Sequence, residues 1–366
     1  MCKCKKVDRC RCKCRFHCYC SSYRPSSRPQ LPPKPPRNIS NRIYVSNQIP
    51  DDVKVIDGPT NTIISTISPL IGAQRKPTSI AANSVTKKVY VTGNYIFTTL
   101  LSPYGVFIID AKTNQITRKF PEVQGTSVAV NETINRIYIW GSTANNSSSR
   151  IFVINGNTDN IVAEIGNSPL ADKDSTAVNP QINRLYQVIA GEPIPSIGNI
   201  NVLFVFDGVT NSQIAAIIIP VNNINYFANA ILPGITVNEL TNKIYITNPF
   251  DNTVSVIDGN TYAVLKTIQV SFFPKSIAVN PISNKIYVCN NDDRSISVID
   301  GNTDTVITTI SLIPFSFPSD ISINPRTNRV YVIASDSRLI TIDGSTDTII
   351  DSISVGTISS AITLIP

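Results

Sequence analysis

Residues 276–310 read SIAVNPISNKIYVCNNDDRSISVIDGNTDTVITTI and contain four short runs rich in Ile, Val, Thr and Tyr. These runs alternate and are β-branched or aromatic, which predicts β-strands. The segments between them carry Asn-Pro, Asn-Asp and Asp-Gly. We expect turns there, because Asn and Asp bond their own backbone and Gly accepts a positive φ. The stretch predicts one antiparallel unit of four strands, A to D in chain order.

The same unit recurs seven times. The Tyr-containing run of strand B lies at 41–45, 87–91, 135–139, 183–187, 242–246, 284–288 and 328–332. The turn after strand C lies at 55–61, 108–114, 153–159, 205–211, 256–262, 298–304 and 341–347. Strand A precedes six of the Tyr runs, at 79–83, 127–131, 176–180, 235–239, 276–280 and 321–325. Four short strands at this period are typical of a β-propeller blade.

The two ends of the repeat region complement each other. No apolar strand A precedes Tyr44, and the last segment, SAITLIP at 360–366, resembles a strand A with no strand B after it. The sequence therefore predicts an all-β, seven-bladed β-propeller over residues 38–366, in which the C-terminal strand completes blade 1. This closure leaves no blade incomplete and no inner edge open to aggregation.

The pattern N-[KR]-[IV]-Y-V, V-I-D-G-x-T and I-A-V-N-P resembles the YVTN family of β-propeller repeat proteins over residues 38–366. The resemblance implies the propeller fold and a protein of a microbial cell surface or extracytoplasmic space. It implies no catalytic residues, because the family shares none. Blade 4 departs most from the pattern, since Gln187 replaces an apolar strand residue.

The residue types of the repeat region argue against an enzyme. It holds no His and a single Cys, Cys289, which excludes a His-based triad or a His-ligated metal there. We interpret the recurrent Asp of the Asp-Gly turns as turn geometry rather than a ring of catalytic carboxylates. We expect no catalytic residues and no cofactor, with a propeller lyase or hydrolase as a distant alternative. A polar pocket in the central channel would favour that alternative.

Loop lengths indicate a candidate binding face. Blades 2, 3 and 4 carry insertions between strands B and C, at 93–105, 141–150 and 190–201, and blade 4 also has the longest link to its successor. These insertions would lie on one face, and loops on a rigid scaffold often bind partners. The candidate ligand-binding residues are Tyr95, Phe97, Tyr104, Glu192, Tyr226 and Phe227. Their rings could anchor a protein or glycan, or pack beneath their own loops. Trp140 ends a strand B, and we expect it in the core.

Residues 1–37 differ from the rest of the chain. They hold eleven Lys or Arg and one acid, a net charge of +10, whereas the remaining residues have a net charge of −3. Residues 1–20 form a Cys-rich basic tail, with cysteines at 2, 4, 10, 12, 14, 18 and 20. Residues 21–37 contain six prolines and indicate an extended linker. We expect the whole segment to be disordered on its own, because it cannot bury apolar area.

Three functions compete for the tail. Neighbouring cations favour thiolates, and an odd number of cysteines in close C-x-C pairs favours disulfides to other chains. The candidate cross-linking residues are Cys2, Cys4, Cys10, Cys12, Cys14, Cys18 and Cys20. A second hypothesis is Zn or Cu binding by Cys10, Cys12, Cys14, His17, Cys18 and Cys20. A third is non-specific, charge-driven binding of a polyanion or an anionic surface. Nucleic acid is not an expected partner of the acidic ring.

The leading hypothesis is a non-catalytic binding or structural protein whose monomeric propeller is displayed on a surface layer, such as a spore coat or exosporium, through protein partners and a cross-linked tail. The alternative is a metal-binding or adhesive surface protein that recognises a glycan or protein through blades 2–4. The charged N-terminus lacks the apolar core of a signal peptide, and no run is long enough for a membrane span. We therefore expect synthesis in the cytoplasm and later assembly on a cell or spore surface.

Overall fold

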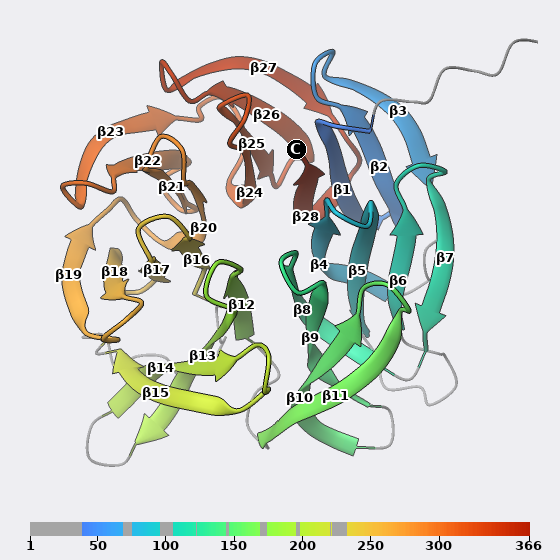
Figure 1. Cartoon of the computed structure of the whole chain (residues 1–366). Coiled ribbons are helices and arrows are strands. Elements are labelled where there is room, and N and C mark those ends of the chain that lie inside the picture. The colour runs from blue at the N-terminus through green and yellow to red at the C-terminus, as the bar shows by residue number, and fades with distance from the viewer. Residues whose placement is uncertain are drawn as a thin grey trace, which may run out of the picture. The chain divides into compact units, whose positions relative to one another are not determined.

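The computed structural model describes residues 39–68, 75–95, 105–121, 123–143, 146–168, 174–194, 198–219, 221 and 233–366. The chain separates into two units, Met1–Asn38 and Ile39–Pro366, and the first lies outside the described residues. The second unit contains seven four-stranded antiparallel sheets arranged as blades around a central opening (Figure 1). The prediction of an all-β, seven-bladed propeller is confirmed.

Each blade orders its strands A, B, C and D from the centre outward. Blade 1 comprises β28 (Ile358–Ile365), β1 (Arg42–Ile49), β2 (Asp52–Asp57) and β3 (Thr62–Ile67). Blade 2 comprises β4 (Arg75–Asn83), β5 (Lys88–Tyr95), β6 (Gly105–Asp110) and β7 (Gln115–Phe120). Blade 3 comprises β8 (Val123–Asn131), β9 (Arg136–Thr143), β10 (Asn146–Asn155) and β11 (Asn160–Ser168). Blade 4 comprises β12 (Asp174–Asn179), β13 (Arg184–Ile194), β14 (Gly198–Asp207) and β15 (Gln213–Ile219).

The last three blades follow the same order. Blade 5 comprises β16 (Ile235–Asn238), β17 (Lys243–Asn248), β18 (Thr253–Asp258) and β19 (Val264–Gln269). Blade 6 comprises β20 (Pro274–Asn280), β21 (Lys285–Asn290), β22 (Ser295–Asp300) and β23 (Thr305–Ser311). Blade 7 comprises β24 (Pro318–Asn324), β25 (Arg329–Ala334), β26 (Arg338–Asp343) and β27 (Thr348–Ser354).

The C-terminal strand closes the ring as predicted. β28 pairs antiparallel with β1, in a register that runs from Arg42 opposite Ile365 to Ile49 opposite Ile358. Blade 1 is therefore built from both ends of the repeat region, and the inner edge of β1 is paired.

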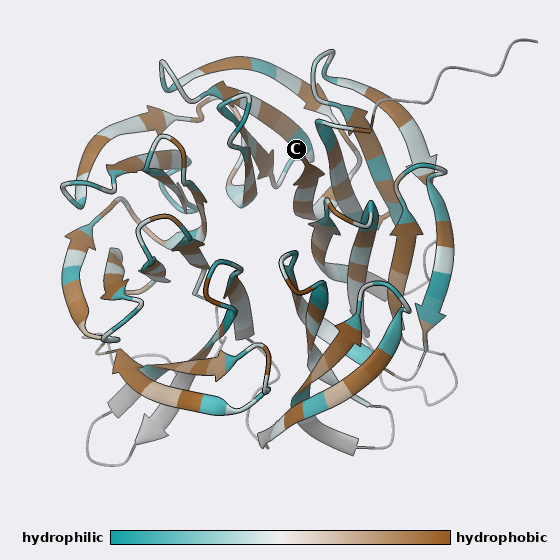
Figure 2. Ribbon diagram, in the orientation of Figure 1, coloured by the Kyte–Doolittle hydropathy of each residue, from teal (hydrophilic) through white to brown (hydrophobic). Residues whose placement is uncertain are grey.

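The hydrophobic core lies between the blades. The Tyr of every strand B is fully buried, from Tyr44 in blade 1 to Tyr331 in blade 7. One cluster joins Tyr90 and Val106 of blade 2 to Ile137 and Phe152 of blade 3, and the other clusters bridge blades in the same way. Figure 2 shows the hydrophobic and hydrophilic bands alternating along the strands. Each sheet thus buries both faces against its neighbours, and its outer strand D stays largely exposed.

The structure corrects the expected role of the turn glycines. None of the Asp-Gly glycines has a positive φ; the residue that adopts it ends the same turn, such as Asp304 (φ 52°) or Asp347 (φ 54°). A second left-handed residue precedes every strand B, such as Asn328 (φ 51°). Glycine is needed instead for a close approach. A Cβ at Gly344 would lie 2.5 Å from Asn328 Oδ1.

Two of the predicted loop insertions are strand extensions. In blade 4, β13 continues past Ile189, and Glu192 pairs with Ile200 of β14. In blade 3, β9 and β10 continue to the pair formed by Thr143 and Asn146. The inserted residues therefore lengthen the hairpins between strands B and C. The blade 2 insertion falls largely within residues 96–104, outside the described residues.

Candidate functional site

A ladder of asparagines joins neighbouring blades. The Asn that ends strand A donates from Nδ2 to Oδ1 of the left-handed Asn in the next blade, as Asn280 does to Asn328 at 2.7 Å. The same bond occurs at six of the seven junctions, through Asn83–Asn135, Asn131–Asn183, Asn179–Asn242, Asn238–Asn284, Asn280–Asn328 and Asn324–Asn41. The Asn residues of the repeat are thus structural.

Ion pairs reinforce the same junctions. Lys285 Nζ lies 2.7 Å from Asp347 Oδ2 of the next blade, and both side chains are largely buried. Tyr287 Oη donates to the other oxygen of Asp347 at 2.8 Å. Equivalent pairs join Lys88 to Asp159 and Lys243 to Asp304 at 2.7 Å. Tyr245 Oη also donates to Asp304 at 3.3 Å, so a Lys, a Tyr and an Asp act together at two of these three junctions.

The junction between blades 1 and 2 lacks the asparagine bond, and three replacements occur together there. Ile365 stands where the other blades have the donor Asn, and Lys87 stands where they have the acceptor. Ala111 replaces the turn Gly, which its blade tolerates because Lys87 places no amide oxygen beside the turn. The Arg42 guanidinium instead donates to the carbonyl of Ala111 at 2.6 Å.

The recurrent turn carboxylates cap their own turns. Asp258 Oδ1 accepts hydrogen bonds from the backbone N–H groups of Asn260 and Thr261, both at 2.8 Å. Those backbone bonds hold the pKa of Asp258 below its usual value. The interpretation of these Asp residues as turn geometry is confirmed at this turn. Both bonds recur at Asp110 and Asp207, and the first of them recurs at Asp343.

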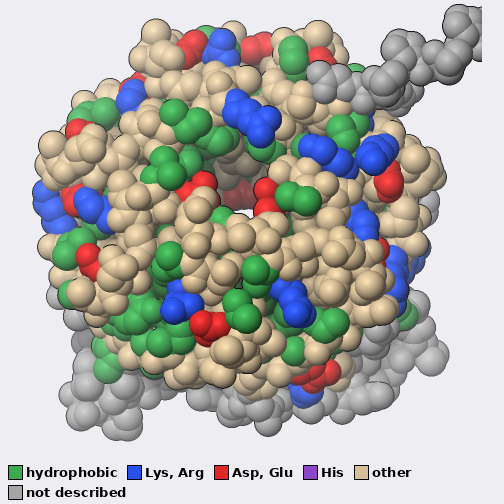
Figure 3. Space-filling model, viewed as in Figure 1, with side chains coloured by type: hydrophobic (Ala, Val, Ile, Leu, Met, Phe, Trp, Pro, Cys, Tyr) green, Lys and Arg blue, Asp and Glu red, His purple; other side chains and the backbone are tan. Residues whose placement is uncertain are grey.

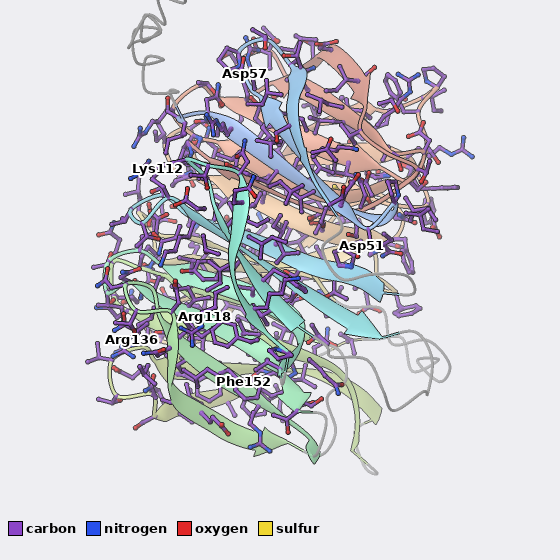
Figure 4. All side chains as sticks on the ribbon, turned by 90° about the vertical axis from the view of Figure 1, so that its right-hand side faces the viewer. Asp51, Asp57, Lys112, Arg118, Arg136 and Phe152 are labelled. Atoms are coloured by element: carbon purple, nitrogen blue, oxygen red, sulfur yellow. The ribbon has the colours of Figure 1, made fainter. Side chains whose placement is uncertain are left out.

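The turns divide between two faces. In Figure 4, Asp57 and Lys112, which belong to the C–D hairpins of blades 1 and 2, lie on one side, and Asp51 of a B–C turn lies on the other. Of the predicted ligand-binding residues, Tyr95 ends β5 opposite Arg75, and Glu192 lies in β13. Phe97, Tyr104, Tyr226 and Phe227 lie outside the described residues, as do the tail cysteines and His17. These binding and cross-linking hypotheses remain predictions.

Three further aromatic residues pack within the propeller, and a fourth is exposed. Trp140 is 3% exposed within the core between blades 3 and 4, as expected. Phe273 packs edge-on against Phe250, with ring centroids 5.6 Å apart. Phe272 is 65% exposed, so it is the clearest surface aromatic of the described links between blades.

The central channel is lined by one position of strand A from every blade. The residues at that position are Ser79, Ser127, Ser175, Gly234, Ser276, Asp320 and Ala361. All but Ala361 line a cavity of about 220 Å³ on the ring axis. The hollow at the centre of the ring is visible in Figure 3. The cavity has room for about seven waters.

Asp320 places a carboxylate on this wall. Its Oδ1 accepts from Ser276 Oγ at 2.7 Å and from the Ile321 N–H at 2.9 Å, and its Oδ2 accepts from the Ile362 N–H at 2.9 Å. Burial raises the pKa of Asp320, against the opposing effects of these bonds and of Lys275. The wall of the central channel is therefore polar and carries one carboxylate.

Asp320 was not predicted from the sequence, although the repeat pattern marks it. Strand A begins with Ser in SIAAN, SVAVN and SIAVN, whereas the residue before ISINP is Asp320. A charged residue at a position that is otherwise small marks a break in the repeat. Asp320 stands out only when the blades are aligned at this one position of strand A.

No family model matches the chain, and no curated protein matches it in sequence. Solved structures do resemble it. One is a protein of unknown function from Desulfotomaculum acetoxidans (13% identity, 89% of this chain and 99% of that one, TM-score 0.64). Others are a chain of the mitotic checkpoint complex (12%, 83% and 84%, 0.63) and the dihydro-heme d1 dehydrogenase NirN in complex with DHE (12%, 92% and 78%, 0.59). At these identities the likeness supports the fold alone.

Two features are absent from the described part of the chain. It contains no helix long and apolar enough to cross a membrane. Within the same ranges, no group of three or more His, Cys, Asp or Glu side chains is placed to hold a metal ion. The predicted Zn or Cu ligands of the tail lie outside those ranges.

Proposed function

We propose that the chain is a non-catalytic binding and structural protein of the YVTN repeat type, displayed on a surface layer such as a spore coat or exosporium. The inter-blade network supports this proposal. Asn side chains of the repeat join blades at six of the seven junctions, Lys–Asp pairs join them at three, and the turn Asp residues cap their own turns. A ring whose recurrent polar groups serve its own rigidity is suited to presenting variable residues at its faces.

Attachment is assigned to the N-terminal cysteines. Cys289 is fully buried in β21, and burial raises its thiol pKa well above the usual value, so it is a poor nucleophile. The seven cysteines of residues 1–20 stand among Lys and Arg, which favour thiolates. Disulfide formation between chains would therefore depend on the tail rather than on the ring.

Electrophoresis under reducing and non-reducing conditions tests the attachment. Extracts of the native source and the oxidised full-length protein should run as large species that collapse to monomer on reduction. A variant with all seven tail cysteines changed to Ser should remain monomeric, whereas Cys289→Ala should cross-link like the wild type. A monomer in non-reducing extracts of the native source would contradict the proposal.

The alternative is a metal-binding or adhesive surface protein. Metal analysis of the same purified sample separates the two: zinc or copper that is lost on Cys→Ser substitution at 10–20 would favour metal binding by the tail. Retention on a glycan array that depends on Tyr95 and Glu192 would favour adhesion. The polar channel keeps the propeller lyase or hydrolase as the distant third hypothesis.

A further inference from the structure

We propose that the central channel binds a small ligand that carries a primary ammonium group, with Asp320 as its counter-ion. The site is the cavity of about 220 Å³ on the ring axis, whose wall combines this carboxylate with serine and threonine hydroxyl groups. This ligand is independent of the partners proposed for the tail and for the loops of blades 2–4.

The fold does not need a charge at this place. The equivalent residue is Ser in four blades, Gly234 in blade 5 and Ala361 in blade 1. Those residues leave the A–B pairing intact, so a small or neutral side chain suffices for the ring. A half-buried carboxylate costs free energy unless a cation or several donors offset it. Three donors offset part of this cost at Asp320. Because six blades keep the ring intact with a neutral residue here, we attribute the charge itself to a ligand.

The carboxylate is oriented but not saturated. Ser276 and the Ile321 N–H occupy Oδ1, and the Ile362 N–H occupies one site on Oδ2. A carboxylate has about four acceptor positions, so one position on Oδ2 remains for a donor. Within the described residues, Asp320 forms no ion pair. Lys275 acts on this carboxylate without forming an ion pair with it. A cationic donor in the channel would supply the missing bond and a directly paired charge.

A local irregularity positions Asp320. In β24, Pro318 pairs with Ala334 and Asp320 pairs with Ile333, so Ser319 is an extra residue in the strand. The Ser319 hydroxyl donates a hydrogen bond to the carbonyl of Ile333 at 3.1 Å. Such a bulge re-aims the next side chain, and bulges are frequent beside binding sites. The same irregularity precedes Ser79 and Ser127 in blades 2 and 3.

The wall chemistry favours an ammonium group over a metal ion. Ca²⁺ takes six to eight oxygen ligands and usually several carboxylates, whereas this wall offers one carboxylate and neutral hydroxyls. An ammonium group donates three hydrogen bonds, which one carboxylate oxygen and two hydroxyl oxygens can accept. Ser127 and Thr176, whose hydroxyls lie 2.8 Å apart, add partners for hydroxyl groups on the ligand. An amino alcohol or an amino sugar therefore matches the wall.

Calorimetric titration of the full chain under reducing conditions tests the site. The probes are ethanolamine and glucosamine, with ethylene glycol, glucose and CaCl₂ as comparisons. We expect at least one amine to bind at millimolar concentration or better, and its uncharged counterpart to bind at least about tenfold more weakly. The proposal is overturned if neither amine binds, if the uncharged counterpart binds equally well, or if Ca²⁺ alone binds.

Variants assign the binding to the channel. Asp320→Asn should weaken amine binding at least about tenfold, because the charge is lost. Asp292→Asn removes an exposed carboxylate from a B–C turn and should leave binding unchanged. If Asp320→Asn does not fold, Ser79→Leu replaces it: the added side chain fills the channel, keeps the carboxylate, and should abolish binding. Unchanged binding in the folded channel variant refutes the site.

Discussion

The close approach at the Asp-Gly turns leads to a prediction that a double-mutant cycle can measure. In blade 7, a Cβ added at Gly344 would lie 2.5 Å from Asn328 Oδ1 and 2.9 Å from the Asn328 backbone oxygen. An ordinary van der Waals contact needs about 3.5 Å. In Gly344→Ala, the Asn328 side chain must therefore move by about 1 Å, away from the donors that it now meets.

The movement of Asn328 determines how much stability Gly344→Ala should cost. Asn328 Oδ1 accepts from Asn280 at 2.7 Å, and its Nδ2 donates to Ser345 Oγ at 3.2 Å. Overpacking costs about 1–3 kcal/mol, and the weakened inter-blade hydrogen bond adds about 1 kcal/mol. We expect Gly344→Ala to lower the free energy of unfolding by about 2–4 kcal/mol. In an Asn328→Gly background, which keeps the left-handed backbone and removes the amide, the same change should cost under about 1.5 kcal/mol.

Urea unfolding followed by fluorescence and circular dichroism measures all four proteins of the cycle. The expected coupling between the two positions is about 1–2 kcal/mol. Blade 2 offers a matched control, since Ala111 already replaces Gly there and Lys87 replaces Asn. Lys87→Asn should destabilise the protein, and Ala111→Gly should restore part of the loss. An equal cost of Gly344→Ala in both backgrounds would refute the close-approach explanation.

Three further predictions follow from the contacts and pKa directions. Lys285→Met should lower the free energy of unfolding by about 1–3 kcal/mol, because it leaves the largely buried Asp347 without its cation. In the same urea assay, the control Lys266→Met at an exposed position should change that free energy by under about 0.5 kcal/mol. Backbone bonds lower the pKa of Asp258 in the folded state. Its contribution to the free energy of unfolding is therefore present above the unfolded pKa of about 4 and should be lost as pH falls through the folded pKa. A native pKa equal to the unfolded value in an NMR titration would contradict this. Burial raises the pKa of Tyr138 to about 12, so folding should lose this contribution as pH rises from about 10 toward 12, and an absorbance titration should show the buried Tyr ionising only with unfolding.

The local pattern was sufficient to predict the ring. Alternation, turn dipeptides and a sevenfold period specify four strands per blade, and the unmatched ends at Tyr44 and 360–366 specify the closure through β28. These features depend on residues close together in sequence, so they can be read without the structure. The predicted insertions of blades 3 and 4 were located correctly, but their strand pairing was not, because spacing alone cannot distinguish a long loop from a longer hairpin.

By itself, the sequence determined the blade, the number of blades and the residues that form each turn, since these follow from β-propensity and turn chemistry within about fifty residues. Only the tertiary structure decided why the turn glycines are required, which Asn of one blade bonds which Asn of the next, and that Asp320 faces a channel beside Ser276 and Ile362. The glycine contact depends on two turns of one blade that pack together. The Asn bonds and the contacts of Asp320 join different blades, so closure of the ring is what brings those groups together.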